Sequence, residues 1–355
     1  MFSHFTVAVV ALAVVTATPA QATPGLVPAA DREVVFTVDG TATYGTLHVP
    51  AHRAGQRLRA ALLLPGSGPT DRDGNQPPHT APNTLAQVAA ALAGDRVATL
   101  RFDKYGTGRT GLGAYRDHPA ELDYPAFVRQ AKAAYEVLRD QPETDPRALM
   151  VAGHSEGAMT ALLLGGTVHP RPAGLALLQP QAIRLLDLVA LQLHAQTAEA
   201  VRQGRLTADQ QRAIDAAIDA AVTALREHRP VDTTDLPPAV AQLFAAFQGA
   251  SGRFVESDDA IYPPDTAAAL RPGTRVLLTC GTNDGQVPCA TTDALAAALR
   301  RAHAGGPGRV PLSGVDHLLH DAGHADTLAP AALDALHRFA ATPLAAGGRT
   351  TPSRR

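Results

Sequence analysis

Val-Ala-Gly-His-Ser-Glu-Gly, residues 151–157, places one serine between two glycines. The apolar run that precedes it predicts a buried strand, and the residues that follow predict the start of a helix. Ser155 would then lie on the sharp turn between them, with its hydroxyl directed out of the sheet. Gly153 and Gly157 suit such a turn because the strained backbone penalises side chains and because strand and helix must approach closely. The stretch therefore predicts that Ser155 is a nucleophile.

Length and charge narrow the class of protein. With 355 residues the chain can bury a large core, either as one big domain with an insertion or as two modest domains. A formal net charge of −2 gives no reason to expect nucleic acid as a partner. Aromatic residues make up 4% of the chain and tryptophan is absent, which also argues against a surface for stacking bases or sugars.

The amino terminus has the pattern of an export signal. Residues 6–16 form an apolar stretch that is too short to span a bilayer, and Ala-Gln-Ala at residues 20–22 is a typical cleavage site. We predict a signal peptide over residues 1–22, cut after Ala22, and hence a secreted protein with no stable membrane insertion after cleavage. The start of this segment carries only His4 and the amino terminus as basic groups, so an uncleaved anchor is the alternative.

The chain has two cysteines, Cys280 and Cys289, which lie close together in sequence. Disulfides persist in the compartments that exported proteins reach. We therefore predict a disulfide between them, and two unpaired thiols are the alternative. Closing a loop of about ten residues is expected to stabilise the fold by roughly 2–3 kcal/mol in the chain-entropy treatment.

Strand and helix patterns alternate along most of the chain. Two alternating segments joined by Asp39-Gly40 predict a leading β-hairpin over residues 33–49. Further alternation predicts a largely parallel sheet with helices on both faces. The expected later strands are 58–64, 96–102, 147–152, 173–179, 275–279 and 309–312, and the expected helices are 83–94, 124–140, 156–164, 292–302 and 330–340.

One long segment breaks this alternation, because it shows helical periodicity and no strand pattern. We predict a helical insertion over residues 181–263, which divides one core into residues 31–180 and residues 264–341. Residues 23–30 are rich in proline, alanine and glycine and predict a flexible leader, and residues 342–355 predict a disordered tail.

Two loops carry a resemblance to a known family. They read Pro-Gly-Ser-Gly-Pro-Thr-Asp-Arg-Asp-Gly-Asn from Pro65, and Arg-Phe-Asp-Lys-Tyr-Gly-Thr-Gly from Arg101. They resemble loops of a bacterial carboxylesterase group related to the serine aminopeptidase-like hydrolases, although relatives usually have arginine in place of Tyr105. The order of elements over residues 33–341 resembles the α/β-hydrolase fold. The resemblance implies a mostly parallel central sheet, helices on both faces and a helical cap insertion.

A serine hydroxyl needs a histidine to accept its proton and a carboxylate to orient that histidine. In the fold that this chain resembles, they follow in the order serine, acid, histidine. Residues 280–289, Cys-Gly-Thr-Asn-Asp-Gly-Gln-Val-Pro-Cys, are similar to the family's G-x-x-D-x-x-V-P acid loop, and Asp284 falls on the acid position. His317 follows the last expected strand, as the histidine of relatives does. The resemblance thus implies Ser155, Asp284 and His317 as catalytic residues, with the predicted disulfide enclosing the acid.

Three other histidines lie near these positions. His320 and His324 are rivals of His317, and with Asp321 they form a cluster that could suggest a metal. Catalytic zinc would need a further, closed ligand pattern, so we expect no metal site. His154 precedes the nucleophile, and we expect its side chain to point away from the serine Oγ and to be structural.

Backbone N–H groups must stabilise the oxyanion of the reaction. The resemblance implies the N–H of Glu156 and a donor from the loop after the third strand, where Ser67 holds the matching place. For the Glu156 side chain two alternatives stay open: a buried partner of an arginine or lysine, or a contact to a cationic substrate group. Four polar residues are expected to pin the loop through hydrogen bonds and ion pairs: Asp71, Arg72, Asp73 and Asn75.

Taken together, the resemblance implies an exported serine hydrolase, a carboxylesterase acting on small to medium acyl esters through an acyl-enzyme. It implies no metal or organic cofactor, and the expected partner is a small-molecule ester. A serine peptidase or amidase is the first alternative, for which Glu156, Glu256, Asp258 and Asp259 could hold a substrate's amino terminus. A non-catalytic ligand-binding protein is the second. The sequence predicts no oligomeric state.

Overall fold

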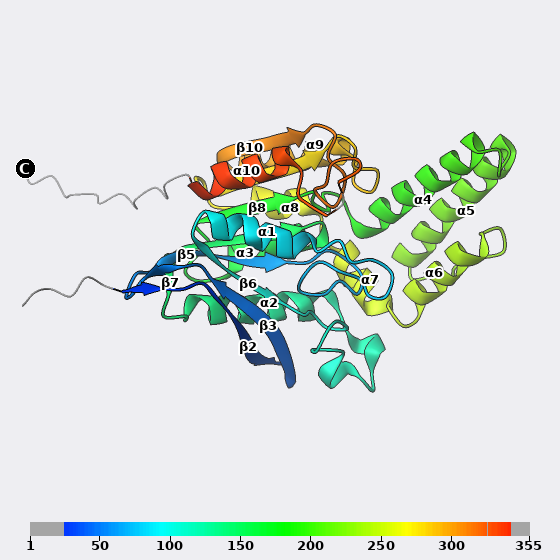
Figure 1. Cartoon of the computed structure of the whole chain (residues 1–355). Helices are drawn as coiled ribbons and strands as arrows, with labels where there is room; N and C mark the ends of the chain where they lie inside the picture. The colour runs from blue at the N-terminus through cyan, green and yellow to red at the C-terminus, as the bar shows by residue number, and fades with distance from the viewer. Residues whose placement is uncertain (1–24, 325, 342–355) are drawn as a thin grey trace, which may run out of the picture.

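A computed structural model describes residues 25–324 and 326–341; the predicted signal peptide, residues 1–22, and the predicted tail, residues 342–355, lie outside them. The described residues contain an eight-stranded sheet in the order β10-β9-β8-β7-β5-β6-β3-β2 (Figure 1). Its strands are β2 (Ala30–Val38), β3 (Thr41–Val49), β5 (Leu58–Leu64), β6 (Val97–Phe102), β7 (Thr144–His154), β8 (Gly174–Leu178), β9 (Arg275–Gly281) and β10 (Gly305–Leu312).

The sheet is mostly parallel. Every pairing from β10 through to β6 is parallel, and β3 and β2 add antiparallel pairings at one edge. Central strands read as continuous apolar runs, such as Ala-Ala-Leu-Leu-Leu at residues 60–64, because both faces of a parallel sheet are covered. Each of these five side chains is at most 2% exposed.

The leading hairpin follows from its turn. Asp39 and Gly40 have φ values of 49° and 75°, and a two-residue turn with positive φ at both positions matches the right-handed twist of the strands. Val38 pairs with Thr41 directly beside this turn. The predicted hairpin is therefore present, but β2 already begins at Ala30.

The segment predicted as a flexible leader is partly ordered, which corrects that expectation. Within this segment, Leu26–Val27 form strand β1, which pairs antiparallel with β4 (His52–Arg53). The amide of Ala54 also donates to the carbonyl of Gly25 at 3.0 Å. Backbone hydrogen bonds hold this segment, and such bonds leave little trace in side-chain periodicity.

Two hydrophobic clusters hold helices against the two faces of the sheet. One contains apolar side chains of α2, α3 and α9, and the other contains side chains of α1 and α10. The bounds of these helices are α1 (Thr84–Gly94), α2 (Tyr124–Arg139), α3 (Glu156–Thr167), α9 (Asp293–Arg301) and α10 (Pro330–Ala341). Short 3₁₀ turns occupy Gly113–Tyr115, Pro119–Glu121 and Cys289–Thr292. Among the described residues, no helix is long and apolar enough to cross a membrane.

The chain between β8 and β9 is helical, as predicted for the insertion. Its helices are α4 (Leu185–Arg202), α5 (Ala208–Arg226), α6 (Pro238–Gln248), α7 (Gly252–Asp259) and α8 (Pro263–Ala268). Figure 1 shows α4, α5 and α6 grouped at one end of the sheet, and we call α4 to α7 the cap. The cap has a hydrophobic cluster of its own, with Ile218 and Phe244 fully buried, and α7 contacts both α2 and α4. The cap is thus a small packed layer joined to the core through α7.

Candidate active site

Ser155 occupies the turn between β7 and α3 with φ 54° and ψ −119°, a conformation that residues with side chains rarely adopt. A Cβ on Gly157 would lie 2.3 Å from the carbonyl oxygen of Leu64, and one on Gly153 would lie 2.0 Å from the carbonyl oxygen of Gly157. Both glycines are therefore required for close backbone packing, as their positions beside the serine predict. The strand, the turn and the helix fix the place of the Ser155 side chain.

Asp284 and His317 meet in the structure although they lie 33 positions apart in the sequence. Asp284 follows β9 and His317 follows β10, and the histidine Nδ1 lies 2.8 Å from the Asp284 Oδ2. The other carboxylate oxygen accepts the backbone N–H groups of Gln286 at 2.9 Å and Val287 at 2.7 Å. The Asp284 side chain is 0% exposed and that of His317 is 9% exposed. With Nδ1 donating to the carboxylate, the imidazole Nε2 carries the lone pair that can accept a proton.

The rival histidines do not reach this carboxylate. His320 is buried, and its Nε2 has no hydrogen-bond partner among the described residues. His324 is exposed, and its backbone N–H donates to the carbonyl of Asp321. In the described part of the chain, no group of three or more His, Cys, Asp or Glu side chains is arranged to hold a metal ion. The structure thus brings His317, and neither rival, to Asp284.

His154 has a closer relation to the site than its sequence position indicates. Its Nε2 lies 2.7 Å from the backbone carbonyl of His317, and the two imidazole rings lie 4.8 Å apart. Burial, followed by the neighbouring His317 ring, lowers the pKa of His154 to about 3. A neutral His154 donates from Nε2 to the carbonyl and supports the backbone of the residue that carries the base. The contact joins residues 163 positions apart, so local sequence gave no signal for it.

The loop after β5 lies directly beside the serine. A Cβ on Gly66 would be 3.2 Å from the Ser155 Cβ. The next residue, Ser67, uses its carbonyl oxygen to accept hydrogen bonds from the Thr70 hydroxyl at 2.7 Å and from the Gln76 amide at 3.2 Å. The structure therefore brings the loop that carries Ser67 close to Ser155, and Glu156 follows Ser155 as the first residue of α3.

Charged residues pin this loop to the strand beside it. Arg72 donates from its guanidinium to Asp103 at 2.7 Å, and Arg101 donates to Asp73 at 2.9 Å. Burial alone would raise the pKa of Asp103, but hydrogen bonds and the charge of Arg72 lower it below its usual range. Asp71 accepts the backbone N–H groups of Asp73 and Asn75 at 2.9 Å each. These contacts match the pinning role predicted for the polar residues of the loop.

The Glu156 side chain is a buried partner of a lysine. Its Oε1 lies 3.4 Å from the Nζ of Lys104, and both side chains are less than 10% exposed. Of the two alternatives that the sequence left open, the structure has the ion pair. Lys104 lies in one of the two loops that resemble the family, and the resemblance implies no role for it. Its only signal was its place among the two lysines of the chain.

One cavity of about 460 Å³ contains these groups. Ser155, His317, Ser67 and Glu156 line it together with Lys104. Its remaining wall is largely apolar and comes from both the cap and the core: Leu122, Phe127, Leu185, Leu188, Val189, Phe247, Phe254 and Val255. An apolar cavity with a few convergent polar groups is typical of a small-molecule site.

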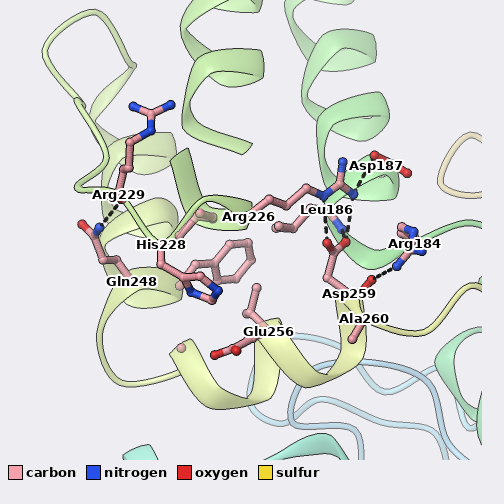
Figure 2. A pocket seen from close by; sticks show the side chains of 14 residues that line it. Arg184, Leu186, Asp187, Arg226, His228, Arg229, Gln248, Glu256, Asp259 and Ala260 are labelled. Carbon is pink, nitrogen blue, oxygen red and sulfur yellow. Dashed lines mark hydrogen bonds and ion pairs between the residues drawn. The ribbon is translucent and has the colours of Figure 1, made fainter. Parts of the chain in front are cut away.

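A second cavity of about 730 Å³ lies within the cap. Figure 2 shows the Arg226 guanidinium facing the carboxylates of Asp187 and Asp259, with both ion pairs at 2.8 Å. Phe247 and Val255 line this cavity as well as the one that contains Ser155. These two apolar side chains therefore form a wall between the cavities.

Cys280 and Cys289 form a disulfide across the loop that contains Asp284. The double substitution Cys280→Ser/Cys289→Ser is expected to lower the free energy of unfolding by roughly 2–3 kcal/mol, because the open chain gains conformational entropy when it unfolds. Denaturant unfolding with and without reductant measures the change. Reduced wild-type protein should have the same free energy of unfolding as the variant, and reductant should not change the free energy of unfolding of the variant. A wild type that is equally stable in both conditions would contradict this expectation.

His154 makes stability depend on pH. The folded-state pKa near 3 lies below the ordinary value of 6.5, so the unfolded chain takes up the proton first as the pH falls. Stability is expected to decline by about 1.4 kcal/mol for each pH unit between roughly 6.5 and 3. His154→Gln presents an amide N–H near the place of Nε2, so it retains a donor for the His317 carbonyl and should remove this slope. Unfolding curves of both proteins at a series of pH values check it, and parallel pH profiles would show that His154 is not responsible.

The comparisons with known proteins agree with this architecture. A family model for the alpha/beta hydrolase family matches residues 61–336. No curated protein gives a significant match. The alpha/beta hydrolase GrgF from Penicillium sp. sh18 is similar in structure with a TM-score of 0.54, at 18% identity over 89% of this chain and 100% of that one. Est1E from Butyrivibrio proteoclasticus, solved with ferulic acid, is similar with a TM-score of 0.51, at 18% identity over 86% of this chain and 97% of that one. A thermophilic esterase from Thermogutta terrifontis is similar with a TM-score of 0.52, at 17% identity over 86% of this chain and 90% of that one. With its mostly parallel sheet, helices on both faces and a matched stretch that covers most of its length, the chain belongs to the alpha/beta hydrolase family.

Proposed function

We propose that this hydrolase is a serine carboxylesterase, with Ser155 as nucleophile, His317 as general base and Asp284 as the carboxylate that orients it. The observation that carries the proposal is the 2.8 Å contact between Asp284 and His317, together with the place of His317 and Ser155 on one cavity wall. A buried carboxylate on Nδ1 holds the imidazole in the tautomer that can accept a proton, and it stabilises the imidazolium that then forms.

The reaction would proceed through an acyl-enzyme. The Ser155 Oγ attacks the ester carbonyl while His317 takes its proton, and the tetrahedral oxyanion accepts hydrogen bonds from the N–H groups of Ser67 and Glu156. Collapse of this intermediate breaks the bond to the alkoxy group, which leaves as an alcohol with the proton from His317. A water deprotonated by His317 then attacks the acyl-enzyme, and a second collapse frees the acid and restores Ser155.

The surroundings of the cavity favour a neutral ester over a peptide with a charged amino terminus. Among the described residues that line the catalytic cavity, Glu156 is the only acidic one, and it pairs with Lys104. Asp259 pairs with Arg226. Burial, and then the charge of Glu156, raise the pKa of Asp258 well above its usual range, which favours its neutral form.

The proposal includes export and an apolar acyl group. The disulfide supports an oxidising compartment, since such bonds are rare in the reducing cytosol. The apolar wall supports small to medium acyl chains, because burial of each methylene contributes about 0.8 kcal/mol.

The central test uses purified protein that lacks residues 1–22. A fluorophosphonate probe should label wild type on Ser155, and Ser155→Ala should show neither label nor turnover above background. p-Nitrophenyl acyl esters should be hydrolysed far faster than aminoacyl p-nitroanilides. A folded wild type without label would refute the enzyme proposal, and faster turnover of the anilides would favour the peptidase.

Phe247 is expected to limit acyl length, because it separates the catalytic cavity from the cap cavity. Phe247→Ala should join the two and raise the ratio of kcat/KM for decanoate to kcat/KM for butyrate esters by about tenfold or more, since apolar contacts discriminate by roughly 1–3 kcal/mol per methylene. Phe247→Leu is the control that retains bulk and should stay near the wild-type ratio. If the alanine variant is folded and keeps the wild-type ratio, Phe247 does not set chain length.

A further inference from the structure

We propose that Lys104 is a positioning residue that orients and polarises both halves of the oxyanion hole. This inference rests on the proposed function and adds a residue to it. Lys104 follows β6 and is 6% exposed. Its Nζ lies 2.5 Å from the carbonyl oxygen of Gly66 and 3.4 Å from the Oε1 of Glu156, so one ammonium group contacts the loop after β5 and the start of α3.

The first contact acts on the peptide group that carries a proposed oxyanion donor. The carbonyl of Gly66 and the N–H of Ser67 belong to the same peptide unit, which is planar and trans. A carbonyl held toward Lys104 therefore directs the N–H of Ser67 to the opposite side. This peptide borders the nucleophile, because a Cβ on Gly66 would lie 3.2 Å from the Ser155 Cβ. Donation by an ammonium to the carbonyl also polarises the unit and makes its N–H a stronger donor.

The second contact acts at the other donor. The N–H of Glu156 is in the first turn of α3, where N–H groups have no partner within the helix. The side chain of the same residue accepts from Lys104 through Oε1, and its Oε2 has no hydrogen-bond partner among the described residues. Within the described chain, the Lys104 ammonium is thus the only hydrogen-bond partner of this buried carboxylate. Lys104 couples the position of α3 to the position of the Gly66–Ser67 peptide.

Lysine suits this place better than arginine. Lys104 and Lys132 are the only lysines among 31 basic residues, so the chain otherwise uses arginine for positive charge. An ammonium is a compact point charge whose three donors diverge, whereas a guanidinium is a planar fork suited to one bidentate partner. A carbonyl and a carboxylate on different elements require diverging donors. The Nζ also lies 5.6 Å from the centre of the Phe127 ring, a distance at which the ring attracts a cation.

The experiment compares Lys104→Met with Lys132→Met, which removes the same group from α2, outside the residues that line the catalytic cavity. Stopped-assay kinetics on a p-nitrophenyl ester give kcat and KM, and an alkylboronic acid serves as a tetrahedral analogue. We expect Lys104→Met to lower kcat by about 10- to 100-fold with KM within about twofold, because weakened donors act on the transition state and not on the bound ester. Affinity for the boronic acid should fall in parallel, and Lys132→Met should match wild type.

Glu156→Gln tests the same arrangement by a second route and serves if Lys104→Met does not fold. It retains the bond between Lys104 and Gly66 but removes the charge on the other partner, so kcat should fall by a smaller factor. In the double variant the two losses should be less than additive, because both act through one contact.

Three results would overturn the inference. Unchanged kcat in a folded Lys104→Met, or in Glu156→Gln, would remove the role of Lys104. A raised KM with unchanged kcat would show that Lys104 binds substrate. Fluorophosphonate labelling of wild type separates these outcomes from failure of the proposed function: absence of label on Ser155 refutes both, whereas normal label and turnover in all variants refute only the role of Lys104.

Discussion

The close approach of α3 to β5 and β7 is the constraint on which the site depends. A methyl group on Gly157 would lie 2.3 Å from the Leu64 carbonyl, and one on Gly153 would lie 2.0 Å from the Gly157 carbonyl. This contact holds Ser155 in a conformation with positive φ that the local chain would not adopt without support. It also brings the first turn of α3 beside the loop after β5. The tight backbone packing therefore sets both the exposure of the serine and the geometry of the proposed donors.

Around this turn, the buried ionisable groups have different hydrogen-bond partners and therefore different roles. Asp284 has three hydrogen bonds to its carboxylate and faces His317, while His154 is buried as a neutral ring behind it. On the opposite side, Lys104 stands between Gly66 and Glu156. In a site of low dielectric each such contact is stronger than in water, and each unpaired charge would cost more. The apolar side chains that the cap contributes to the cavity help to maintain that low dielectric.

Several features could be predicted because their physical cause is local. The Asp39-Gly40 turn, the glycines beside Ser155 and the apolar central strands follow from steric limits on one or a few residues. The acid loop between Cys280 and Cys289 and His317 were found by resemblance, and the structure brings Asp284 and His317 together. The prediction of a flexible leader was wrong over Leu26–Val27, because the pairing of these residues with β4 depends on backbone hydrogen bonds and not on a side-chain pattern.

Short-range sterics and apolar periodicity in the sequence determined the alternation of strands and helices, the turn that presents Ser155 and the helical nature of the insertion. The resemblance to a family, which is also a property of the sequence, implied the class of fold and the order of the candidate residues. Tertiary structure alone decided which charge Glu156 meets, where His154 donates and which side chains divide the two cavities. Those contacts join residues such as Lys104 and Glu156, 52 positions apart, or His154 and His317, 163 positions apart. Long-range contacts depend on how whole elements pack, and the pattern of no single segment contains that information.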